Sequence, residues 1–535
     1  MRKFSSYGPV DNKLHYHAPR ADLIDRAYNH LTGGANPDKG GHYITVWGPR
    51  QTGKTWIMQQ VTRKIEQIGD FEACIVSMQS AKNETTDMGV LDVFVKKLRQ
   101  WFDKDFPDID RWTKIAGLFG KRYFEKPLIL IIDEFDALNE NCINKFATEF
   151  RDIYISRQNL ANRQTEKNEC MMLHGLGLIG IRSVLGIENI TGSPFNVQRS
   201  LNLPNLIFSE VEKLFAWYEK ERGQKIEPDV INRLFCETRG QPGLTCWFGE
   251  LLTETFNKDK DIPVTMTHFE GMFKMAVNAL PNNNILNIIS KAKQKPYRNA
   301  VLDLFKTDQK TEFAFDDSIL NFLFTNGVID TEKVKDNLYV KFSSPFVQKR
   351  LFNYFSRELF GYVGKIVEPF ENLEDTITKE YLNIPNLMKR YQKYLKTNRD
   401  WLLKDAPRRK DMRIFEAVYH FNLYMYLHHF LGIKKAKVFP EFPTGNGQVD
   451  LIIRYAGSLY AIELKSYTDE TGYHEALDQA ARYGKQLGLK EIALVFFVEY
   501  IDEANREKYE KNYMCKKNGV MVIPIFVDTG IDPLS

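Results

Sequence analysis

The sequence has no long hydrophobic run and no patterned cysteines. Its longest apolar runs, such as Leu128–Ile132, are far shorter than the ~18–20 residues that span a membrane. The first residues contain no apolar stretch of the kind found in secretory signals. The six cysteines are scattered without a CxxC pair, so we expect neither a disulfide framework nor a zinc site. These absences predict a cytoplasmic protein in a reducing compartment, with no membrane partner.

Biased composition is also lacking. Gly and Pro number 33 and 21 among 535 residues, which excludes collagen-like and low-complexity chains. Lys and Arg total 73 against 69 Asp and Glu, a net charge of +4 that neither requires nor excludes nucleic acid. The length favours three to four domains.

Strand and helix patterns alternate over roughly the first 200 residues, which is typical of an α/β domain. A β-branched run at 43–47 is followed by a Gly-rich turn and a helical pattern. The continuous apolar runs 127–135 and 176–186 suit strands buried on both faces, with a helix between them at 143–158. We therefore predict an α/β multidomain protein whose first domain holds a parallel sheet.

A complete GxxxxGK[ST] motif follows the first predicted strand and precedes a helix, the context that a phosphate-binding loop requires. Its glycines let the backbone wrap around phosphates, and the amides with the helix amino terminus face them. Lys54 is expected to reach the β- and γ-phosphates and Thr55 to ligate Mg²⁺. The alternative is a chance glycine-rich turn. The predicted ATP-binding residues of the motif are Gly48, Pro49, Arg50, Gln51, Thr52, Gly53, Lys54 and Thr55.

Asp133 and Glu134 end the apolar strand within 127–135. An acidic pair at the carboxyl end of a strand completes a nucleotide site of this type. Asp133 is expected to hold Mg²⁺ through water, and Glu134 to orient and deprotonate the attacking water. The alternative is that Asp133 only caps a helix.

Together with the segment 7–25, these motifs resemble the AAA-like ATPases of the STAND signalling group, over roughly residues 1–355. The resemblance implies that Arg20, and with it Tyr16, lies on the base or phosphate side of the nucleotide. It also implies a helical lid whose GxP turn is Gly240 and Pro242. A sensor position would fall at Arg182 or Ser183, and the γ-phosphate arginine is left open among Arg50, Arg151 and Arg199.

A second group of charged residues lies near the carboxyl end. Asp450 begins one predicted strand, and Glu463 and Lys465 stand two apart on the next, so they share a face. Pairing of the strands would bring the three together. Two carboxylates with a carbonyl suit Mg²⁺ or Mn²⁺, which activates water for attack on a phosphodiester while Lys465 positions it. The alternative is an amphipathic hairpin with solvated charges.

These residues resemble the PD-(D/E)XK nuclease superfamily over about residues 410–530. The resemblance implies that Asp450, Glu463 and Lys465 are catalytic and that Glu416 is the metal-ligating acid of the first helix. Gln479 and Tyr483 match the QxxxY helix found in some branches.

The stretch 389–413 carries ten Lys and Arg against three Asp, interleaved with Tyr391, Tyr394 and Trp401. It suits a phosphate backbone with aromatic stacking. The alternative is a helical linker whose aromatics pack against the next domain.

The domains expected from both resemblances are an ATPase core (1–205), a helical lid (206–285), a winged-helix-like domain (286–358), a charged helical linker (359–411) and a nuclease-like domain (412–535). The leading hypothesis is an ATPase that gates a metal-dependent nuclease, in defence against mobile elements. Its partner is nucleic acid, DNA ahead of RNA, with a homo-oligomer left open. The alternative is a nucleotide switch that binds nucleic acid or a protein without cleavage.

Overall fold

The computed structural model describes residues 1–34, 41–162, 172–180, 198–305, 311–367, 371–408, 414–432, 436–440, 450–467 and 469–530. The chain forms two compact units. The first comprises Met1–Phe273 and Phe315–Gly327, and the second Lys274–Ala314 and Val328–Ser535. None of the helices in the described ranges combines the length and apolar character needed to cross a bilayer.

The first unit is built on a five-stranded parallel sheet, as the sequence predicts. Its strands lie in the order β2-β3-β4-β1-β5. The order places β1, which precedes the phosphate-binding loop, beside β4 and one strand from β3. The strands are β1 Tyr43–Trp47, β2 Glu72–Ser77, β3 Leu128–Asp133, β4 Leu173–Gly180 and β5 Gln198–Asn202.

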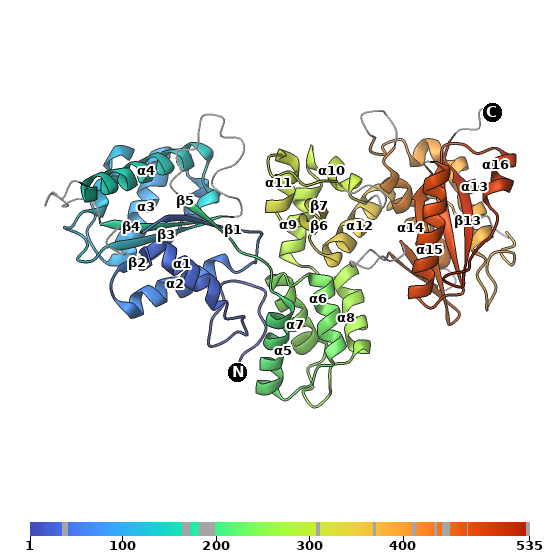
Figure 1. Ribbon diagram of the computed structural model, residues 1–535, viewed down its shortest axis with the longest axis horizontal. Helices are drawn as coiled ribbons and strands as arrows, with labels where there is room; N and C mark the ends of the chain where they lie inside the picture. The colour runs from blue at the N-terminus through green and yellow to red at the C-terminus, as the bar shows by residue number, and fades with distance from the viewer. Residues whose placement is uncertain are drawn as a thin grey trace. The chain divides into compact units, whose positions relative to one another are not determined.

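Helices cover both faces of this sheet (Figure 1). Along β3 successive side chains alternate between the two faces: Ile129 and Ile131 pack under α1 and α2, whereas Leu130 and Ile132 pack under α3 and α4. All six residues of β3 are therefore buried, as its continuous apolar run predicts. The helical elements of this layer are α1 Ala21–Thr32, α2 Lys54–Ile68, η2 Gln79–Asn83, α3 Asp87–Phe102, η3 Trp112–Phe119, η4 Phe135–Ala137 and α4 Glu140–Asn162.

A group of helices follows the sheet in the chain, over the region that we expected to be a lid, and these helices are called the lid below. Its helices start at clear signals: Pro228 and Pro242 occupy first turns, where the missing N–H costs nothing. The helices are α5 Phe208–Arg222, α6 Pro228–Thr238, α7 Pro242–Glu250, the π-helical η5 Leu251–Phe256 and α8 Met266–Asn278.

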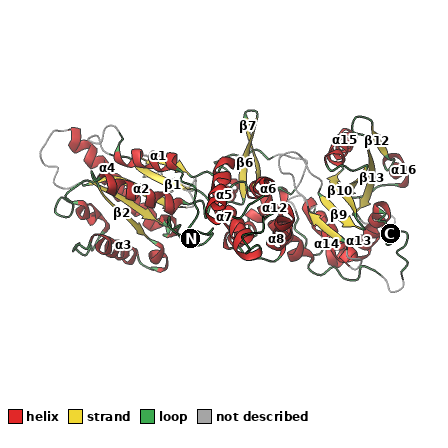
Figure 2. Ribbon diagram, turned by 90° about the horizontal axis from the view of Figure 1, so that it is seen from below, coloured by secondary structure: helices red, strands yellow, loops and turns green. Residues whose placement is uncertain are grey.

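Three short helices and a β-hairpin come next in the chain, within the region that we expected to be winged-helix-like. The strands of the hairpin pair antiparallel from Ile329↔Phe342 to Val334↔Asn337, and Figure 2 shows them projecting from the neighbouring helices. The elements are α9 Asn283–Ala292, α10 Tyr297–Asp303, α11 Ser318–Thr325, β6 Ile329–Val334, β7 Asn337–Phe342 and α12 Pro345–Phe360.

The second unit contains a six-stranded mixed sheet in the order β12-β13-β11-β10-β9-β8. The strands β8, β9 and β10 pair antiparallel, and β10, β11 and β13 pair parallel. In chain order α14, β8, β9, β10, α15 and β11 give an α-β-β-β-α-β succession. The strands are β8 Lys437–Pro440, β9 Leu451–Tyr455, β10 Ser458–Ser466, β11 Glu491–Val498, β12 Tyr513–Cys515 and β13 Val520–Asp528.

The helix α15 (Glu470–Gln486) packs on β11 and β13 over an apolar cluster that includes Ala480, Leu494 and Phe526. The helix α14 (Glu416–Gly432) meets α12, where the Phe421 ring lies 5.0 Å from that of Phe352. The region that we predicted as nuclease-like and most of the region that we predicted as winged-helix-like thus belong to one unit, whereas Phe315–Gly327 belongs to the first unit. The remaining helices of this unit are α13 Ile384–Leu402 and α16 Glu503–Tyr509.

The helix α13 lies in the stretch that the sequence suggested as a linker, and it is packed rather than free. It contacts β13, and the hydroxyl of buried Tyr391 donates a hydrogen bond to Oδ1 of Asn422 in α14 at 3.0 Å. The hydroxyl of Tyr394 donates to the Val363 carbonyl at 2.7 Å. These two tyrosines are therefore core residues, and the interpretation of packed aromatics fits them.

Candidate nucleotide site and a second acidic site

The predicted phosphate motif forms a tight loop over residues 48–53 after β1, and its last two residues, Lys54 and Thr55, begin α2. Gly53 has a φ of 90°, a conformation that favours glycine, and Gln51 adopts a φ of 59° although it is not glycine. The loop is held internally by the Thr52 hydroxyl, which donates to the Pro49 carbonyl at 3.0 Å. The sequence signature thus folds into the strand-loop-helix arrangement in which amides and a helix amino terminus face an anion.

Lys54 is folded back onto this loop. Its amine donates hydrogen bonds to the carbonyls of Gly48 and Pro49, both at 2.8 Å. Burial lowers the pKa of Lys54 to about 8, although the carboxylates of Asp136, Asp133 and Glu134 oppose that shift. A phosphate placed in the loop would replace two neutral carbonyls as the partner of this amine and favour its charged form.

Thr55 and Asp133 meet directly. The Thr55 hydroxyl donates to Oδ2 of Asp133 at 2.7 Å, and the Glu134 amide donates to Oδ1 at 2.8 Å. Burial raises the pKa of Asp133, while these two hydrogen bonds oppose the rise. A hydroxyl and a carboxylate are the oxygen donors that Mg²⁺ takes beside a nucleotide, so the residues present fit that ion.

Glu134 follows in a left-handed conformation with a φ of 54°, which turns its side chain away from the strand direction. Its side chain is accessible to water. Partial shielding, together with the carboxylates of Asp133 and Asp136, raises the pKa of Glu134. A carboxylate with a raised pKa is a better proton acceptor than an ordinary glutamate.

Asp136 is a member of this site that the sequence interpretation missed. Its carboxyl carbon would lie 3.1 Å from a Cβ placed on Gly180, the last residue of β4, so only glycine leaves room there. Among the carboxylates that act on Lys54, Asp136 has the largest effect. The signal was present in the sequence as a third acid in the run Asp133–Asp136.

The lid is bonded to the tip of the phosphate-binding loop. The Gly243 amide donates to the Gln51 carbonyl at 3.1 Å, and the Gln241 side-chain amide donates to the Arg50 carbonyl at 2.9 Å. A Cβ on Gly243 would lie 2.3 Å from Oε1 of Gln51. Pro242, predicted as a nucleotide contact, begins α7 between these two donors. The run at 239–243 thus brings lid and loop together, through backbone groups that the motif does not reveal.

Arg20 lies at the connection from the sheet to the lid. Its guanidinium donates to the carbonyls of Pro204 at 2.8 Å and Asn205 at 3.1 Å, and it pairs with Glu210 at 3.4 Å. Burial lowers the pKa of Arg20. Tyr16 is buried among aromatic rings, 5.1 Å from Phe4. Both residues have protein partners in this structure, and their predicted roles at a nucleotide stay predictions.

The other predicted arginines are placed as follows. Arg199 pairs in register with Ile44, three residues before the end of β1, so it lies away from the phosphate-binding loop. Arg151 is half-buried in α4, and Arg50 is exposed at the loop itself. Arg182 and Ser183 fall outside the described residues. Position therefore favours Arg50 over Arg199 as a neighbour of the phosphates.

The segment 315–327 packs against the other side of the same loop. The Trp47 ring, directly before Gly48, lies 6.3 Å from that of Phe315 and 6.2 Å from that of Phe324. A Cβ on Gly327 would lie 3.0 Å from Cβ of Pro49. The chain on both sides of this segment belongs to the second unit. The loop is thus in contact with a segment that leads directly into β6.

The second site gathers Asp450, Glu463 and Lys465, as predicted. Oδ2 of Asp450 accepts a hydrogen bond from the Leu464 amide at 2.7 Å, across the β9–β10 hairpin. Nζ of Lys465 lies 3.4 Å from Oε1 of Glu463. All three side chains are buried, at 6%, 1% and 2% exposure. The alternative of a solvated amphipathic hairpin therefore does not describe these residues.

Tyr483 on α15 faces this group. Its hydroxyl accepts a hydrogen bond from the Gln479 side-chain amide at 2.5 Å. Burial raises the pKa of Tyr483, and the charges of Glu463, Lys465 and Asp450 all act on its hydroxyl.

Metal-binding groups at this second site number two among the described side chains, Asp450 and Glu463. No group of three His, Cys, Asp or Glu side chains is placed to hold a metal ion within the described ranges. The side chain of Glu416 falls outside the described residues, so its predicted role is untested. Two carboxylates suit a hard cation completed by carbonyl or water oxygens, and these residues fit Mg²⁺ or Mn²⁺ in that way.

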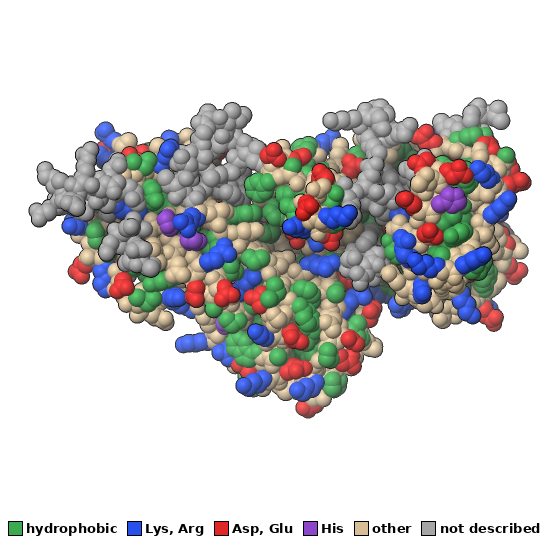
Figure 3. Space-filling model, viewed as in Figure 1, with side chains coloured by type: hydrophobic (Ala, Val, Ile, Leu, Met, Phe, Trp, Pro, Cys, Tyr) green, Lys and Arg blue, Asp and Glu red, His purple; other side chains and the backbone are tan. Residues whose placement is uncertain are grey.

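The cations of α13 are partly committed to protein partners. Arg390 pairs with Glu371 and Asp375, and Lys396 pairs with Asp528 at 2.9 Å. Nε of Arg399 donates to the Thr529 carbonyl at 2.9 Å. On the face shown in Figure 3, acidic and basic side chains are interspersed. Arg409, Lys410 and Arg413 fall outside the described residues.

The first unit, with its parallel sheet, has an α/β fold consistent with a P-loop ATPase core. The sequence matches no known protein family and no curated protein. The structure is similar to a Walker-type ATPase of Pyrococcus abyssi, at 11% identity and a TM-score of 0.43, over 65% of this chain and 99% of that one. It is also similar to the ORC2 protein of Aeropyrum pernix, solved with ADPNP and ADP, at 14% identity and a TM-score of 0.37, over 66% and 96%. A third similar structure is the RuvB Holliday junction branch migration motor of Thermotoga maritima, at 12% identity and a TM-score of 0.34. The match covers 61% of this chain and 92% of that one. Likenesses this distant say nothing of activity.

Proposed function

We propose that the chain binds and hydrolyses ATP with Mg²⁺ at the loop 48–55, and that this cycle gates a metal-dependent nuclease at Asp450, Glu463 and Lys465. In the first site Lys54 turns from the Gly48 and Pro49 carbonyls toward the β- and γ-phosphates. Bound Mg²⁺ neutralises charge on the phosphate oxygens, and Thr55 with Asp133 would hold it.

Glu134 performs the proton transfer. It accepts a proton from water as the water oxygen bonds to the γ-phosphorus and the bond to the β–γ bridging oxygen breaks. Its raised pKa and its access to water support this role. The products are ADP and phosphate, and the γ-phosphate no longer occupies the loop that Gly243 and Gln241 contact.

At the second site Asp450 and Glu463 would hold the cation, which lowers the pKa of bound water for attack on a phosphodiester. Lys465, next to Glu463 and beside the Asp450 strand, stabilises the charge that develops on the phosphate. One observation carries the nuclease proposal: two carboxylates and a lysine are buried together on adjacent strands, with a hydrogen-bonded Gln–Tyr pair facing them. Burying such charges costs free energy of folding, and a buried cluster of charged groups is for that reason a candidate functional site.

Gating is supported by the contact of Phe315 and Phe324 with Trp47. A change in the phosphate-binding loop reaches this segment through Trp47 and Pro49. Because the segment continues into β6, the change passes to the unit that carries the acidic site. Defence against mobile elements is the biological setting that the resemblances imply, and it remains part of this proposal.

The test is a cleavage assay on duplex DNA, single-stranded DNA and RNA with Mg²⁺ or Mn²⁺, with and without ATP. The wild type is compared with Lys54→Ala and Asp450→Asn proteins. We expect cleavage by the wild type, loss of cleavage with Asp450→Asn, and loss of the ATP effect with Lys54→Ala. Absence of cleavage under every condition would overturn the nuclease proposal and leave the ATPase.

A second candidate is a nucleotide switch that binds nucleic acid or a protein without cutting. The close pairing of Lys465 with Glu463 favours it, because an ion pair of this kind also stabilises a purely structural hairpin. In that case Asp450→Asn leaves the phenotype that the protein confers on a cell unchanged, whereas Lys54→Ala abolishes that phenotype.

A further inference from the structure

Trp401 on the solvent face of α13 and Tyr362 in the loop after α12 form an aromatic pair that the nucleotide and acidic sites do not use. Trp401 is 44% exposed and Tyr362 is 78% exposed, and their ring centroids lie 5.9 Å apart at 45°. The indole N–H of Trp401 donates to Oδ1 of Asn398 at 3.0 Å. Gly364, with a φ of 67°, passes so close that a Cβ there would lie 3.0 Å from the indole ring. The pair is held in position although it is open to water.

Lysines surround this pair along the same exposed stripe of the helix. Positions 393, 396, 397, 400 and 401 are exposed at the spacing of one helical face, and Lys404 follows after the helix end. Lys393 and Lys404 make no ion pair with any described residue. Lys393 and Trp401 are eight residues apart, or about 12 Å along a helix, a span of roughly two nucleotides of an extended strand.

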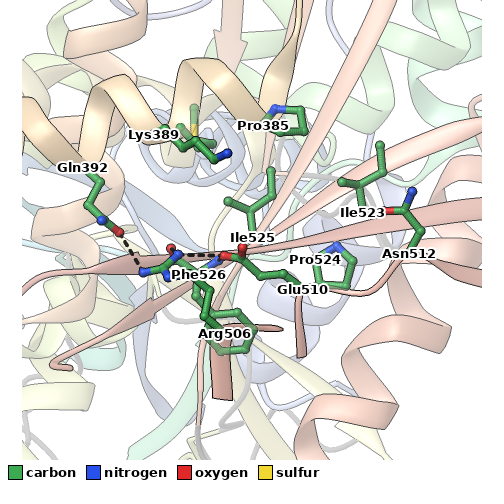
Figure 4. Close-up of a pocket in the computed structure, with 11 residues that line it drawn as sticks. Pro385, Lys389, Gln392, Arg506, Glu510, Asn512, Ile523, Pro524, Ile525 and Phe526 are labelled. Carbon is green, nitrogen blue, oxygen red and sulfur yellow. Dashed lines mark hydrogen bonds and ion pairs between the residues drawn. The ribbon is translucent and has the colours of Figure 1, made fainter. Parts of the chain in front are cut away.

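The helix is fixed to the sheet that carries the acidic site. Figure 4 shows Gln392, Arg506 and Glu510 joined beside β13, where a cavity of about 190 Å³ lies against Pro385. Oε1 of Gln392 accepts hydrogen bonds from the amide of Asp528 at 2.9 Å and from Arg506 at 3.3 Å. Glu510 accepts from the Phe526 amide at 2.7 Å and from Arg506 at 2.8 Å. The position of α13 relative to β13 is therefore determined by backbone groups of the strand.

The stripe and the acids lie at the same end of the sheet. The parallel strands β10, β11 and β13 end together, with Ser466 opposite Phe497 and Val498 opposite Asp528. Lys465 is one residue from the end of β10, and Lys396 bonds Asp528 at the end of β13. Two strand spacings separate β10 from β13, which is roughly 10 Å.

We propose that Trp401 and Tyr362 form a stacking platform for a base of single-stranded nucleic acid, with Lys393 and Lys404 on its phosphates. Exposed aromatics take any base through its π-face, and lysines follow the backbone. The inference rests on the proposed function, because it names a single strand as the form of substrate delivered to Asp450 and Glu463. Neutral or basic ligands have no matching charge on this stripe, whose single acid among the exposed helical positions is Asp400.

The test measures binding of a fluorescein-labelled thymidine oligonucleotide of about 15 nucleotides to the full-length protein, with a uridine oligonucleotide and a duplex as further arms. We expect Trp401→Ala and Tyr362→Ala each to weaken binding of the single strands by about fivefold or more, the effect of losing one stacked base. Trp401→Phe should retain most of the affinity for the single strands. The alanine variants should bind the duplex almost as tightly as the wild type does. Trp101→Ala is the matched control, because Trp101 is 43% exposed in the first unit.

Affinity of Trp401→Ala within about twofold of the wild type, or an equal loss with Trp101→Ala, would overturn the platform. Cleavage in the same samples separates the two proposals. Cleavage that is unchanged by Trp401→Ala, with unchanged binding, refutes the platform and leaves the nuclease. Binding that depends on Trp401 without any cleavage refutes the nuclease and leaves the platform. A wild type that binds no nucleic acid refutes both.

Discussion

The hydroxyl of Thr55 and the carboxylate of Asp133 lie 2.7 Å apart although 78 residues separate them in the chain. The hydrogen bond joins the first turn of α2 to the last residue of β3, and it aligns the two oxygen donors that a nucleotide-bound Mg²⁺ requires. The parallel sheet order makes this possible, because β4 alone lies between β1 and β3.

Lys54→Ala should weaken ATP binding by about 10- to 100-fold, the effect of losing a charge-assisted hydrogen bond to phosphate. Lys64→Ala is the matched control on the same helix, since Lys64 pairs with Asp25 on the surface. The measurement is titration of a fluorescent ATP analogue. An equal loss for both variants would place the nucleotide elsewhere.

ATP affinity should fall as the pH rises above about 8. Burial has lowered the pKa of Lys54 to about 8 without nucleotide, so the free protein loses this charge between pH 7 and pH 9. Phosphate favours the charged amine, so binding above pH 8 takes up a proton, and affinity falls about tenfold from pH 7 to pH 9. Calorimetry in two buffers of different ionisation enthalpy checks the proton uptake. A constant affinity over this range contradicts the assignment of Lys54.

Gly243→Ala should disturb the link between lid and phosphate-binding loop. The added Cβ meets Cβ of Gln51 at 2.6 Å, so the loop must shift, at a cost of about 1–3 kcal/mol for overpacking. ATP hydrolysis should fall along with thermal stability. Gly271→Ala in α8 is the control, because nothing lies within 4 Å of its Cβ. There, alanine should be neutral or raise stability by about 0.5–1 kcal/mol.

Asp450→Asn should reduce cleavage by at least about 100-fold, since the charge that binds the cation is lost. The amide oxygen still accepts the Leu464 N–H, so the fold should persist, as circular dichroism would verify. Asp478→Asn in α15 is the control, because Asp478 accepts from Tyr513 at the surface. Cleavage by Asp450→Asn at the wild-type rate would separate this carboxylate from any activity.

Phe315→Ala should uncouple ATP from cleavage while leaving basal ATP hydrolysis near the wild-type rate. Phe315 is 45% exposed, so its truncation removes the contact with Trp47 without opening a core. Phe256→Ala, at 42% exposure in the lid, is the matched control. The readout is the ratio of cleavage rates with and without ATP, and a ratio unchanged in Phe315→Ala would exclude this route of gating.

Local patterns predicted the elements and the sites that depend on neighbours in the chain. Three of these features have a sequence pattern that fits within ~20 residues, the span of a strand pair or strand-loop-helix unit. They are the loop 48–55, the strand ending at Asp133, and the hairpin with Asp450 and Glu463. The relationships that the sequence concealed are distant ones. The stretch 389–413 suited either a phosphate backbone or a packed linker in the sequence, which does not reveal that Lys396 pairs with Asp528, 132 residues away.

Burial made the same difference among the aromatics of the basic stretch. Tyr391, Tyr394 and Trp401 look alike in the sequence, yet only Trp401 is exposed, because the first two face α14 and the loop after α12. Asp136 was overlooked for a related reason. Its importance depends on β4 ending at Gly180, a residue that comes more than 40 positions later in the chain.

The border of the carboxyl-terminal sheet has a consequence for self-association. Strand β12 pairs with β13 only over Val520–Val522, so the rest of β13 has no strand on that side among the residues that the structure describes. Pro524 has no N–H to offer, and Glu510 and Gln392 already occupy those of Phe526 and Asp528. An incoming extended chain finds no row of donors there, so this border resists edge-to-edge stacking and the fibrous aggregates that grow from it.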